Sequence, residues 1–210
     1  MAKAKERVEI TAPNMEIVQF EITGTTPYVQ LRFTQKAREQ MMADMEMGSK
    51  QKKKSKEKPP RDFDEDYKQA MYESYDGWRG IPSTAFRNAM IAACRIVGFV
   101  MTQAKLEVFC EQDGFDKTDD TPLVRIIGEP KRFIKEVRNA NGNCDLRVRA
   151  KFWPWSAVVS VRYDADCFTI EDITNLMHRV GLQVGVGEGR YCSPKSCGQG
   201  WGAFSIAKAG

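Results

Sequence analysis

The sequence has a single histidine in 210 residues, and none of its six cysteines lies in a CxxC pair. Cys192 and Cys197 are too far apart for the usual zinc knuckle, and His178 falls within a predicted helix. A structural zinc site needs four closely placed sulfur or nitrogen ligands. We therefore expect no metal and no cofactor. We assign His178 no catalytic role, because a lone histidine more often serves packing or the surface.

Long apolar runs are also missing. No stretch has the roughly 20 consecutive apolar residues that a membrane-spanning helix needs. The first ten residues, MAKAKERVEI, are polar and mixed in charge, unlike a secretory signal peptide. We expect a cytoplasmic protein with no membrane segment, in which the cysteines stay reduced.

The excess of positive charge is small, with a formal net charge of +4 at pH 7. Any affinity for nucleic acid must therefore come from local clusters of cations. Hydrophobic residues make up 42% of the chain, which is enough for a core. The length suits one domain over residues 1–210 that carries large insertions.

The spacing of apolar residues predicts the secondary structure. In the first strand, Ile17, Phe20 and Ile22 are the expected core positions. The predicted strands cover residues 15–23, 104–110, 123–127, 131–138, 146–152, 157–163 and 200–206, and the predicted helices cover 34–48, 83–97 and 170–180.

The ends of two predicted helices carry recognisable signals. Ser83 or Thr84 is expected to cap the helix of residues 83–97, and Gly98 to end it. The second helix begins with a capping-box variant at Thr169, and Gly181 is expected to end it.

Without the insertions, the order of the elements is strand, helix, strand, strand, helix, strand. This βαββαβ order predicts an α+β protein with a modified ferredoxin-like or RNA-recognition-motif fold. Such a sheet has two helices on one face and leaves the other face open. Single-stranded nucleic acid binds to surfaces of this kind through cations and stacking aromatic side chains.

Residues 31–79 form an insertion that contains a basic loop, 48–61, predicted to be mobile. Lys52, Lys53 and Lys54 make it a candidate arm for phosphate groups. An acidic run follows it, Asp62-Phe-Asp-Glu-Asp66, and is expected to neutralise the arm when nothing is bound. A solvated loop without function explains the same composition.

A β-hairpin is predicted over residues 131–152, since Asn-Gly at its centre favours a tight turn. Its first strand carries Arg132 and Lys135. In its second strand, Leu146, Val148, Ala150 and Phe152 point one way and Arg147, Arg149 and Lys151 the other. Three cations on one strand face repel each other unless something negative lies there. The alternative is a solvated strand face.

The stretch VGVGEGRYCSPKSCGQGWGAF, residues 184–204, contains six glycines. A cluster this dense indicates positive φ angles, or a ligand or chain lying against the backbone. Arg190 and Lys195 lie among bare backbone amides, a combination that suits phosphate groups. A glycine-rich hairpin that only closes a sheet is the alternative.

Two of these stretches resemble a known family. Gly80-Ile-Pro-Ser-Thr-Ala-Phe-Arg87-Asn-Ala is similar to the start of the first helix in the RAMP superfamily, the CRISPR-associated backbone proteins. Gly187-Glu-Gly189-Arg190 and Gly198-Gln-Gly200-Trp-Gly202-Ala-Phe204 are similar to its glycine-rich loop and last strand. The hairpin of residues 131–152 corresponds in position to the family's thumb. Ser83 departs from the family, which often has glycine there.

The resemblance implies a non-catalytic subunit that binds single-stranded RNA, guide-like, or single-stranded DNA. It also implies assembly into a filament or a CRISPR-like effector backbone in antiviral defence, with other effector subunits as further partners, and a stand-alone or virus-encoded relative fits as well. The nucleic-acid-binding residues predicted from the clusters and the resemblance together are Lys52, Lys53, Lys54, Arg79, Ser83, Arg87, Arg132, Lys135, Arg147, Arg149, Lys151, Gly187, Gly189, Arg190 and Lys195.

Two other functions stay open. The first is an endoribonuclease with an acidic site in residues 31–79, for which the candidates are Asp44, Asp62, Asp64, Asp66 and Asp76. The second is a viral structural or inhibitory protein that uses the fold for protein contacts. Protomers would meet through the Met-rich segment 41–47 or through Trp153 and Trp155, although core packing explains these side chains equally well.

Overall fold

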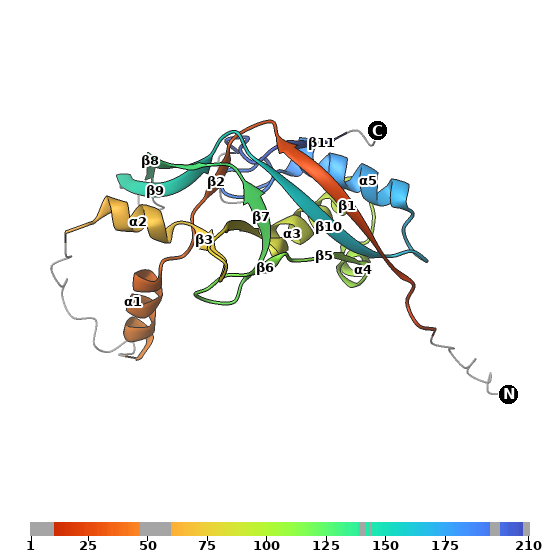
Figure 1. The fold of residues 1–210 in the computed structure, drawn as a ribbon, viewed down its shortest axis with the longest axis horizontal. Helices are drawn as coiled ribbons and strands as arrows, with labels where there is room; N and C mark the ends of the chain where they lie inside the picture. The colour runs from red at the N-terminus through yellow and green to blue at the C-terminus, as the bar shows by residue number, and fades with distance from the viewer. Residues whose placement is uncertain (1–10, 47–59, 139–141, 143, 194–197, 208–210) are drawn as a thin grey trace.

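The computed structural model describes residues 11–46, 60–138, 142, 144–193 and 198–207. Figure 1 shows its helices and strands. In chain order they are β1 (Met15–Gly24), β2 (Tyr28–Gln30), α1 (Gln35–Glu46), α2 (Phe63–Gln69), β3 (Tyr72–Glu73), β4 (Arg79–Pro82), α3 (Ser83–Ile96), α4 (Met101–Glu107), β5 (Val108–Cys110), β6 (Gly114–Phe115), β7 (Pro122–Ile127), β8 (Pro130–Arg138), β9 (Cys144–Phe152), β10 (Ser156–Asp164), α5 (Ile170–Arg179), the π-helical turn η2 (Val180–Val184) and β11 (Phe204–Ile206). The protein is thus α+β, as the sequence predicts.

The main sheet has the strand order β11-β1-β10-β7-β4-β3, and all of its pairs are antiparallel. β5 also pairs with β10, and β6 with β7. The longest pairing joins β1 to β10, from Met15 opposite Asp164 to Thr23 opposite Ser156. Alternate residues of both strands are buried, so one face of this pair packs into the core and the other is turned to solvent.

A second, three-stranded sheet has the order β2-β9-β8. Its strands β8 and β9 form the hairpin expected over residues 131–152, with Lys131 opposite Lys151 and Lys135 opposite Arg147. Helix α2 lies beside this hairpin (Figure 1), where the Tyr67 hydroxyl donates to the Pro130 carbonyl at 2.8 Å. The sequence analysis did not anticipate α2, although its N-cap, Asp62, lies in the acidic run.

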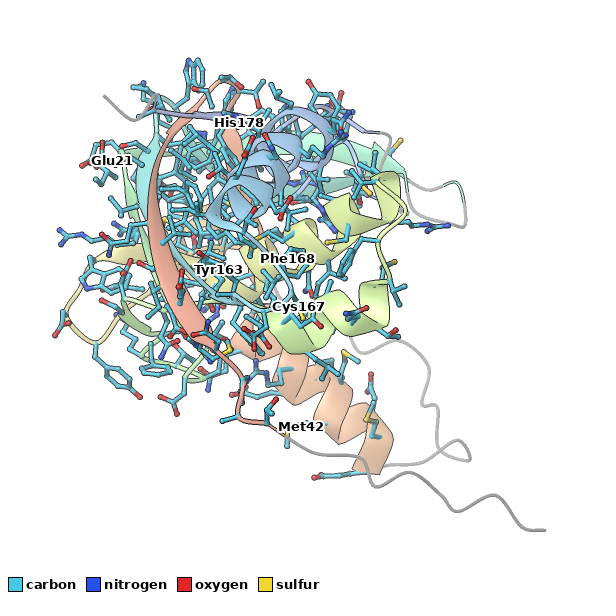
Figure 2. All side chains as sticks on the ribbon, turned by 90° about the vertical axis from the view of Figure 1, so that its right-hand side faces the viewer. Glu21, Met42, Tyr163, Cys167, Phe168 and His178 are labelled. Carbon is cyan, nitrogen blue, oxygen red and sulfur yellow. The ribbon has the colours of Figure 1, made fainter. Side chains whose placement is uncertain are left out.

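Helices α3, α4 and α5 cover one face of the main sheet. Figure 2 shows them on one side of β1, with Tyr163 between sheet and helices and Glu21 on the far side. The buried face of α3 includes Phe86, Met90 and Cys94, at the spacing the sequence predicts. The capping box of α5 is also present, because Thr169 and Asp172 bond each other's backbone amides.

A chain of aromatic rings joins the two sheets in the core. Trp155 lies 5.6 Å from Tyr28 of β2 and 6.3 Å from Phe204 of β11, measured between ring centroids. Its indole nitrogen donates to the Thr26 carbonyl at 2.8 Å. Trp155 therefore packs in a buried corner after the hairpin, whereas Trp153 is 45% exposed.

Several expectations about side chains are wrong. Ile17 is 61% exposed, because it lies an odd number of residues from Phe20 and Ile22 and therefore faces solvent. Leu146 alternates with Arg147 as expected, but it is 47% exposed while Val148, on the same face, is buried. Neither Ser83 nor Thr84 caps α3: the cap is Pro82, which offers no side-chain oxygen.

Three expected boundaries also change. Residues 104–110 are not one strand, because α4 occupies the segment up to Glu107 and only Val108–Cys110 is extended. Gly181 does not end the second helix, which continues as η2 to Val184. The space of a Cβ at Gly181 is filled by the carbonyl oxygen of Phe204, 2.2 Å away. The last strand is short and begins only at Phe204.

Candidate nucleic-acid interface

One face of the β8–β9 hairpin gathers cations from both strands. The register places Lys131 opposite Lys151, Phe133 opposite Arg149 and Lys135 opposite Arg147. Since alternate residues share a face, these six side chains lie on one surface, which we call the hairpin basic face. Among the residues that the structure describes, no carboxylate forms an ion pair with the four cations Lys131, Lys135, Arg147 and Lys151.

Aromatic rings are interleaved with these cations. Trp201 of the glycine-rich stretch meets Phe133 edge to face, with ring centroids 5.6 Å apart. The ammonium of Lys135 lies 5.1 Å from the Trp201 ring centroid, and that of Lys151 lies 5.3 Å from the Phe133 centroid. Lys135 also donates to the side-chain oxygen of Gln199 at 2.8 Å. Alternating cations and rings are what single-stranded nucleic acid requires of a protein surface.

Arg149 has a different role from its neighbours on the strand. Its guanidinium donates to both carboxylate oxygens of Glu188, at 2.6 and 2.7 Å, and its side chain is only 4% exposed. Glu188 thus supplies, within the chain, part of the negative charge that a cluster of cations needs. Arg149 is therefore a structural link between the hairpin and the glycine-rich stretch, and not an exposed phosphate ligand.

A groove of about 570 Å³ adjoins this link. Thr84 and Asn88 of α3 line one side of it, and Gly187, Glu188 and Arg190 line the other. Helix α3 begins at this groove, and no side chain caps its N-terminus. The free backbone amides of its first turn therefore favour an anion. Glu188 lines the groove and also holds Arg149 of the hairpin, so this ion pair links the groove to the hairpin.

The glycines have a local explanation. Gly187 has φ +81°, and a Cβ there would lie 2.5 Å from the Tyr28 ring. Gly189 has φ +73°, and a Cβ there would lie 2.4 Å from the Trp201 ring. Of the alternatives that the glycine cluster left open, positive φ angles are confirmed, and the groups that approach these two glycines are the protein's own aromatic side chains.

No protein-family model matches the chain, and no curated protein matches it. Any function must therefore be inferred from the hairpin basic face and from the position of each predicted residue.

Four predicted site residues lie elsewhere. Arg132 is on the opposite face of the hairpin, paired with Asp64 of α2. Arg87 donates to the carbonyls of Val108 and Lys105 and covers the Phe109 ring, so it braces α4 and β5. Ser83 is buried next to the groove without lining it, and Arg79 lies on β4 outside the groove. The structure does not bring these four together with the hairpin basic face.

Arg190 does line the groove, where its guanidinium donates to the Gly187 carbonyl at 3.0 Å and so stabilises the turn of the glycine-rich stretch. The predicted sites Lys52, Lys53, Lys54 and Lys195 lie outside the described residues, as does most of the predicted basic loop 48–61.

The open face of the main sheet differs from the expected binding surface. The aromatic residues of β1 and β10 are Phe20 and Tyr163, and both point into the core. The outward positions carry aliphatic and polar side chains, among them Val158 and the hydrogen-bonded pair Gln19 and Ser160. In these two strands no ring is available for stacking, so the aromatic component of the interface lies at the hairpin instead.

Sequence reasoning missed Lys131, Thr84 and Asn88 as members of the site. Lys131 was recognisable, because it alternates with Lys135 and so shares its face. Thr84 and Asn88 had no such signal, since the groove depends on where residues 184–192 pack against α3.

Three of the five acidic candidates in residues 31–79 have structural roles, whereas Asp44 accepts a hydrogen bond from Gln40 and Asp76 is exposed. Asp62 caps α2, and hydrogen bonds from the amides of Glu65 and Asp64 lower its pKa. Asp64 pairs with Arg132, and Asp66 with Arg61. In the part of the chain that the structure describes, no three His, Cys, Asp or Glu side chains come together as a metal site. None of the described helices has the length and apolar character needed to cross a bilayer.

Proposed function

We propose that the protein binds single-stranded nucleic acid, RNA above all, along the hairpin basic face and the adjoining groove, and that it does so without cleaving it. The observation that carries the proposal is a set of four cations, Lys131, Lys135, Arg147 and Lys151, interleaved with the rings of Phe133 and Trp201. No carboxylate among the described residues forms an ion pair with these cations. Phosphates neutralise such cations, and bases stack on such rings.

The fold supports the same function. The order β11-β1-β10 with β5 and β7 beside β10, and the helices α3 and α5 on one face, agree with a modified ferredoxin-like arrangement. We propose that the β8–β9 hairpin corresponds to the thumb of RAMP-superfamily backbone proteins, which the helix start at Gly80 and the glycine-rich stretch resemble. We propose on this basis that the protein is a subunit that assembles along the bound strand.

Binding without cleavage is the simpler reading of the acidic residues. Asp62, Asp64 and Asp66 serve as a helix cap and as ion-pair partners. None of them is left to activate a water or a ribose hydroxyl. The polar part of the groove lining consists instead of hydroxyl, amide and guanidinium groups and of one carboxylate, Glu188, which is bonded to Arg149.

Fluorescence anisotropy with a labelled single-stranded RNA tests the proposal. The double variant Lys131→Glu, Lys151→Glu places two acids at facing positions of the hairpin and is expected to abolish binding. The control Lys105→Glu, Arg125→Glu changes the net charge equally at exposed positions on α4 and β7, and it is expected to bind almost as wild type. Equal losses in both variants would show non-specific attraction and overturn the site. Shortening of the labelled RNA during the assay would overturn the absence of cleavage.

A further inference from the structure

Helix α1 is exposed over most of its surface. Met41, Met42 and Met45, which share one side of the helix, are 47, 55 and 73% exposed. Figure 2 shows α1 with Met42 below the body of the molecule, set apart from α5. An isolated helix of 12 residues is marginal in water, because packing of an apolar face supplies most helical stability. An exposed Met-rich face of this kind is suited to a protein partner.

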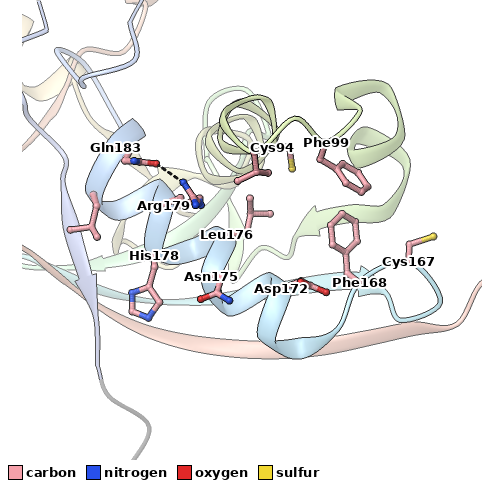
Figure 3. Close-up of a pocket in the computed structure, with 12 residues that line it drawn as sticks. Cys94, Phe99, Cys167, Phe168, Asp172, Asn175, Leu176, His178, Arg179 and Gln183 are labelled. Atoms are coloured by element: carbon pink, nitrogen blue, oxygen red, sulfur yellow. Dashed lines mark hydrogen bonds between the residues drawn. The ribbon is translucent and has the colours of Figure 1, made fainter.

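The same chain offers a groove that fits such a face. It lies between α5 and the end of α3 with the connection that follows α3, and it has a volume of about 760 Å³ (Figure 3). Its apolar wall includes Val97, Phe99, Phe168, Leu176 and Leu182. The rings of Phe99 and Phe168 pack at a tilt with centroids 4.8 Å apart, while Val97 and Leu182 are 52 and 68% exposed. The groove thus presents apolar side chains that no other element covers in the described structure.

A helix α1 does not reach the groove of its own chain. α1 starts five residues after β2 ends, and the Arg38–Asp119 ion pair, at 3.1 Å, holds it beside the β6–β7 connection. Figure 1 places α1 and α5 toward opposite ends of the long axis. An α1 that occupies this groove must therefore come from a second copy of the chain.

The charges fix the direction in which α1 would lie. The last turns of α1 carry Asp44 and Glu46 beside the methionines. Helix α5 begins with Glu171 and Asp172 and ends with His178 and Arg179. If α1 runs parallel to α5, its acidic end meets Arg179. If it ran antiparallel, the same end would meet the acidic residues in the first turn of α5. The two helices, ~18 and ~15 Å long, also match in length.

We propose that α1 of one protomer docks, parallel to α5, in the α3–α5 groove of the next. The contact joins two different surfaces of the protein, so it leaves a free α1 at one end and a free groove at the other. Repeated contacts of this kind generate a filament of protomers. This inference deepens the assembly part of the proposed function and rests on it, but the contact itself needs no nucleic acid.

Complementation between two variants tests the contact by sedimentation velocity on nuclease-treated protein. Met42→Glu, Met45→Glu disables α1 and keeps the groove, while Leu182→Glu disables the groove and keeps α1. Wild type is expected to gain mass with concentration beyond that of a dimer. Each variant alone is expected to stay monomeric. An equimolar mixture is expected to form dimers and nothing larger, because each pair has only one intact α1 and one intact groove. All three positions are exposed, so folding is checked by unchanged melting curves.

The matched control is Leu106→Glu, at a position 77% exposed on α4 and outside the groove, which is expected to assemble as wild type. The parallel direction of α1 is tested by charge reversal. Asp44→Arg alone is expected to weaken assembly, and mixing it with protein that carries Arg179→Glu is expected to restore the contact. A monomeric wild type, association of Leu182→Glu alone, or a mixture that stays monomeric would overturn the proposal.

A second measurement distinguishes this contact from the RNA-binding proposal. It is the affinity of the same variants for an RNA that is long enough for only one protomer. Assembly lost with unchanged RNA affinity in the two variants supports the contact. Wild-type assembly without any RNA affinity overturns the binding proposal and leaves the contact standing.

Discussion

Glu188 accepts two hydrogen bonds from the Arg149 guanidinium, at 2.6 Å from Nε and 2.7 Å from Nη2. The two residues are 39 positions apart in the sequence, one in the glycine-rich stretch and the other in β9. A backbone bond from the Glu188 amide to the Val29 carbonyl, at 2.9 Å, fixes the same residue to β2. This pair sets the position of the groove relative to the hairpin basic face.

Replacing Glu188 by glutamine should destabilise the protein. The amide keeps one acceptor for Arg149 but leaves the positive charge of a nearly buried guanidinium without its counter-ion. We expect the free energy of unfolding to fall by roughly 2 kcal/mol, measured by urea denaturation. Glu136→Gln, at an exposed position of β8, is the control and should change it by less than about 0.5 kcal/mol. Equal midpoints for both variants would mean that the pair does not hold the hairpin in place.

The same pair changes how the hairpin should be tested. The sequence analysis treats Arg147, Arg149 and Lys151 as one set of exposed cations, but reversing the charge of Arg149 would place it against Glu188 and disrupt the fold. A loss of RNA binding in such a variant would carry no information about the interface. Variants at Lys131, Lys135, Arg147 and Lys151 avoid this ambiguity.

The salt dependence of RNA binding should identify the phosphate contacts one by one. Each phosphate contact on a single strand contributes about 0.7 to the slope of log affinity against log salt concentration, because a bound counter-ion is released. We expect Lys135→Gln to reduce that slope by about 0.7. Arg132→Gln, on the opposite face and paired with Asp64, should leave the slope unchanged. A reduction for Arg132 and none for Lys135 would place the strand on the other side of the hairpin.

Local sequence patterns predicted the pieces of this protein well where one face of an element packs. The alternation in β9 placed Arg147, Arg149 and Lys151 on one face, and the spacing from Phe86 to Cys94 placed the buried face of α3. These patterns depend only on whether a side chain points toward the core, and that is set by residues close in the chain.

The failures come from contacts between distant residues. Nothing near Arg149 in the sequence shows that Glu188 will cover it. The segment around residues 101–110 is short, and its apolar residues fit a strand as well as a helix, until Ala104 and Val108 pack inward and leave Leu106 exposed. The groove lined by Asn88 was out of reach for the same reason, because it exists only once the glycine-rich stretch lies against α3.

Two glycines with the same backbone conformation should respond differently to alanine. Gly98 has φ +76° and open space where a Cβ would lie, so Gly98→Ala should cost only the conformational strain of about 1 kcal/mol. Gly202 has φ +71°, and a Cβ there would lie 1.7 Å from the Val186 carbonyl oxygen. Backbone atoms do not yield as a flexible side chain does, so Gly202→Ala should cost roughly 3 kcal/mol or more. Urea denaturation of both variants measures this, and equal losses would contradict the close packing of Gly202 against Val186.

Acid should weaken the attachment of α1 to the body through Asp119. This carboxylate lies 3.1 Å from Arg38 of α1 and 3.2 Å from Arg32. Burial by itself would raise the pKa of Asp119, but hydrogen bonds from Thr121, Arg32 and Arg38 outweigh it and lower that pKa well below its ordinary value. The folded protein therefore binds this proton more weakly than the unfolded chain. The stabilisation is complete above a pH of about 4 and is lost as the pH falls toward the lowered pKa.

Asp119→Asn should consequently lower the free energy of unfolding near neutral pH, and the difference from wild type should shrink as the solution is acidified below about pH 4. Urea denaturation over a pH series measures that difference. Asp76→Asn, at an exposed position, serves as the control. A difference between wild type and Asp119→Asn that is constant with pH would mean that Asp119 stabilises the protein through packing and not through its charge. The same acidification should release α1 from the β6–β7 connection while its methionine face stays intact. Sedimentation of the Asp119→Asn variant therefore shows whether the assembly contact depends on this anchor.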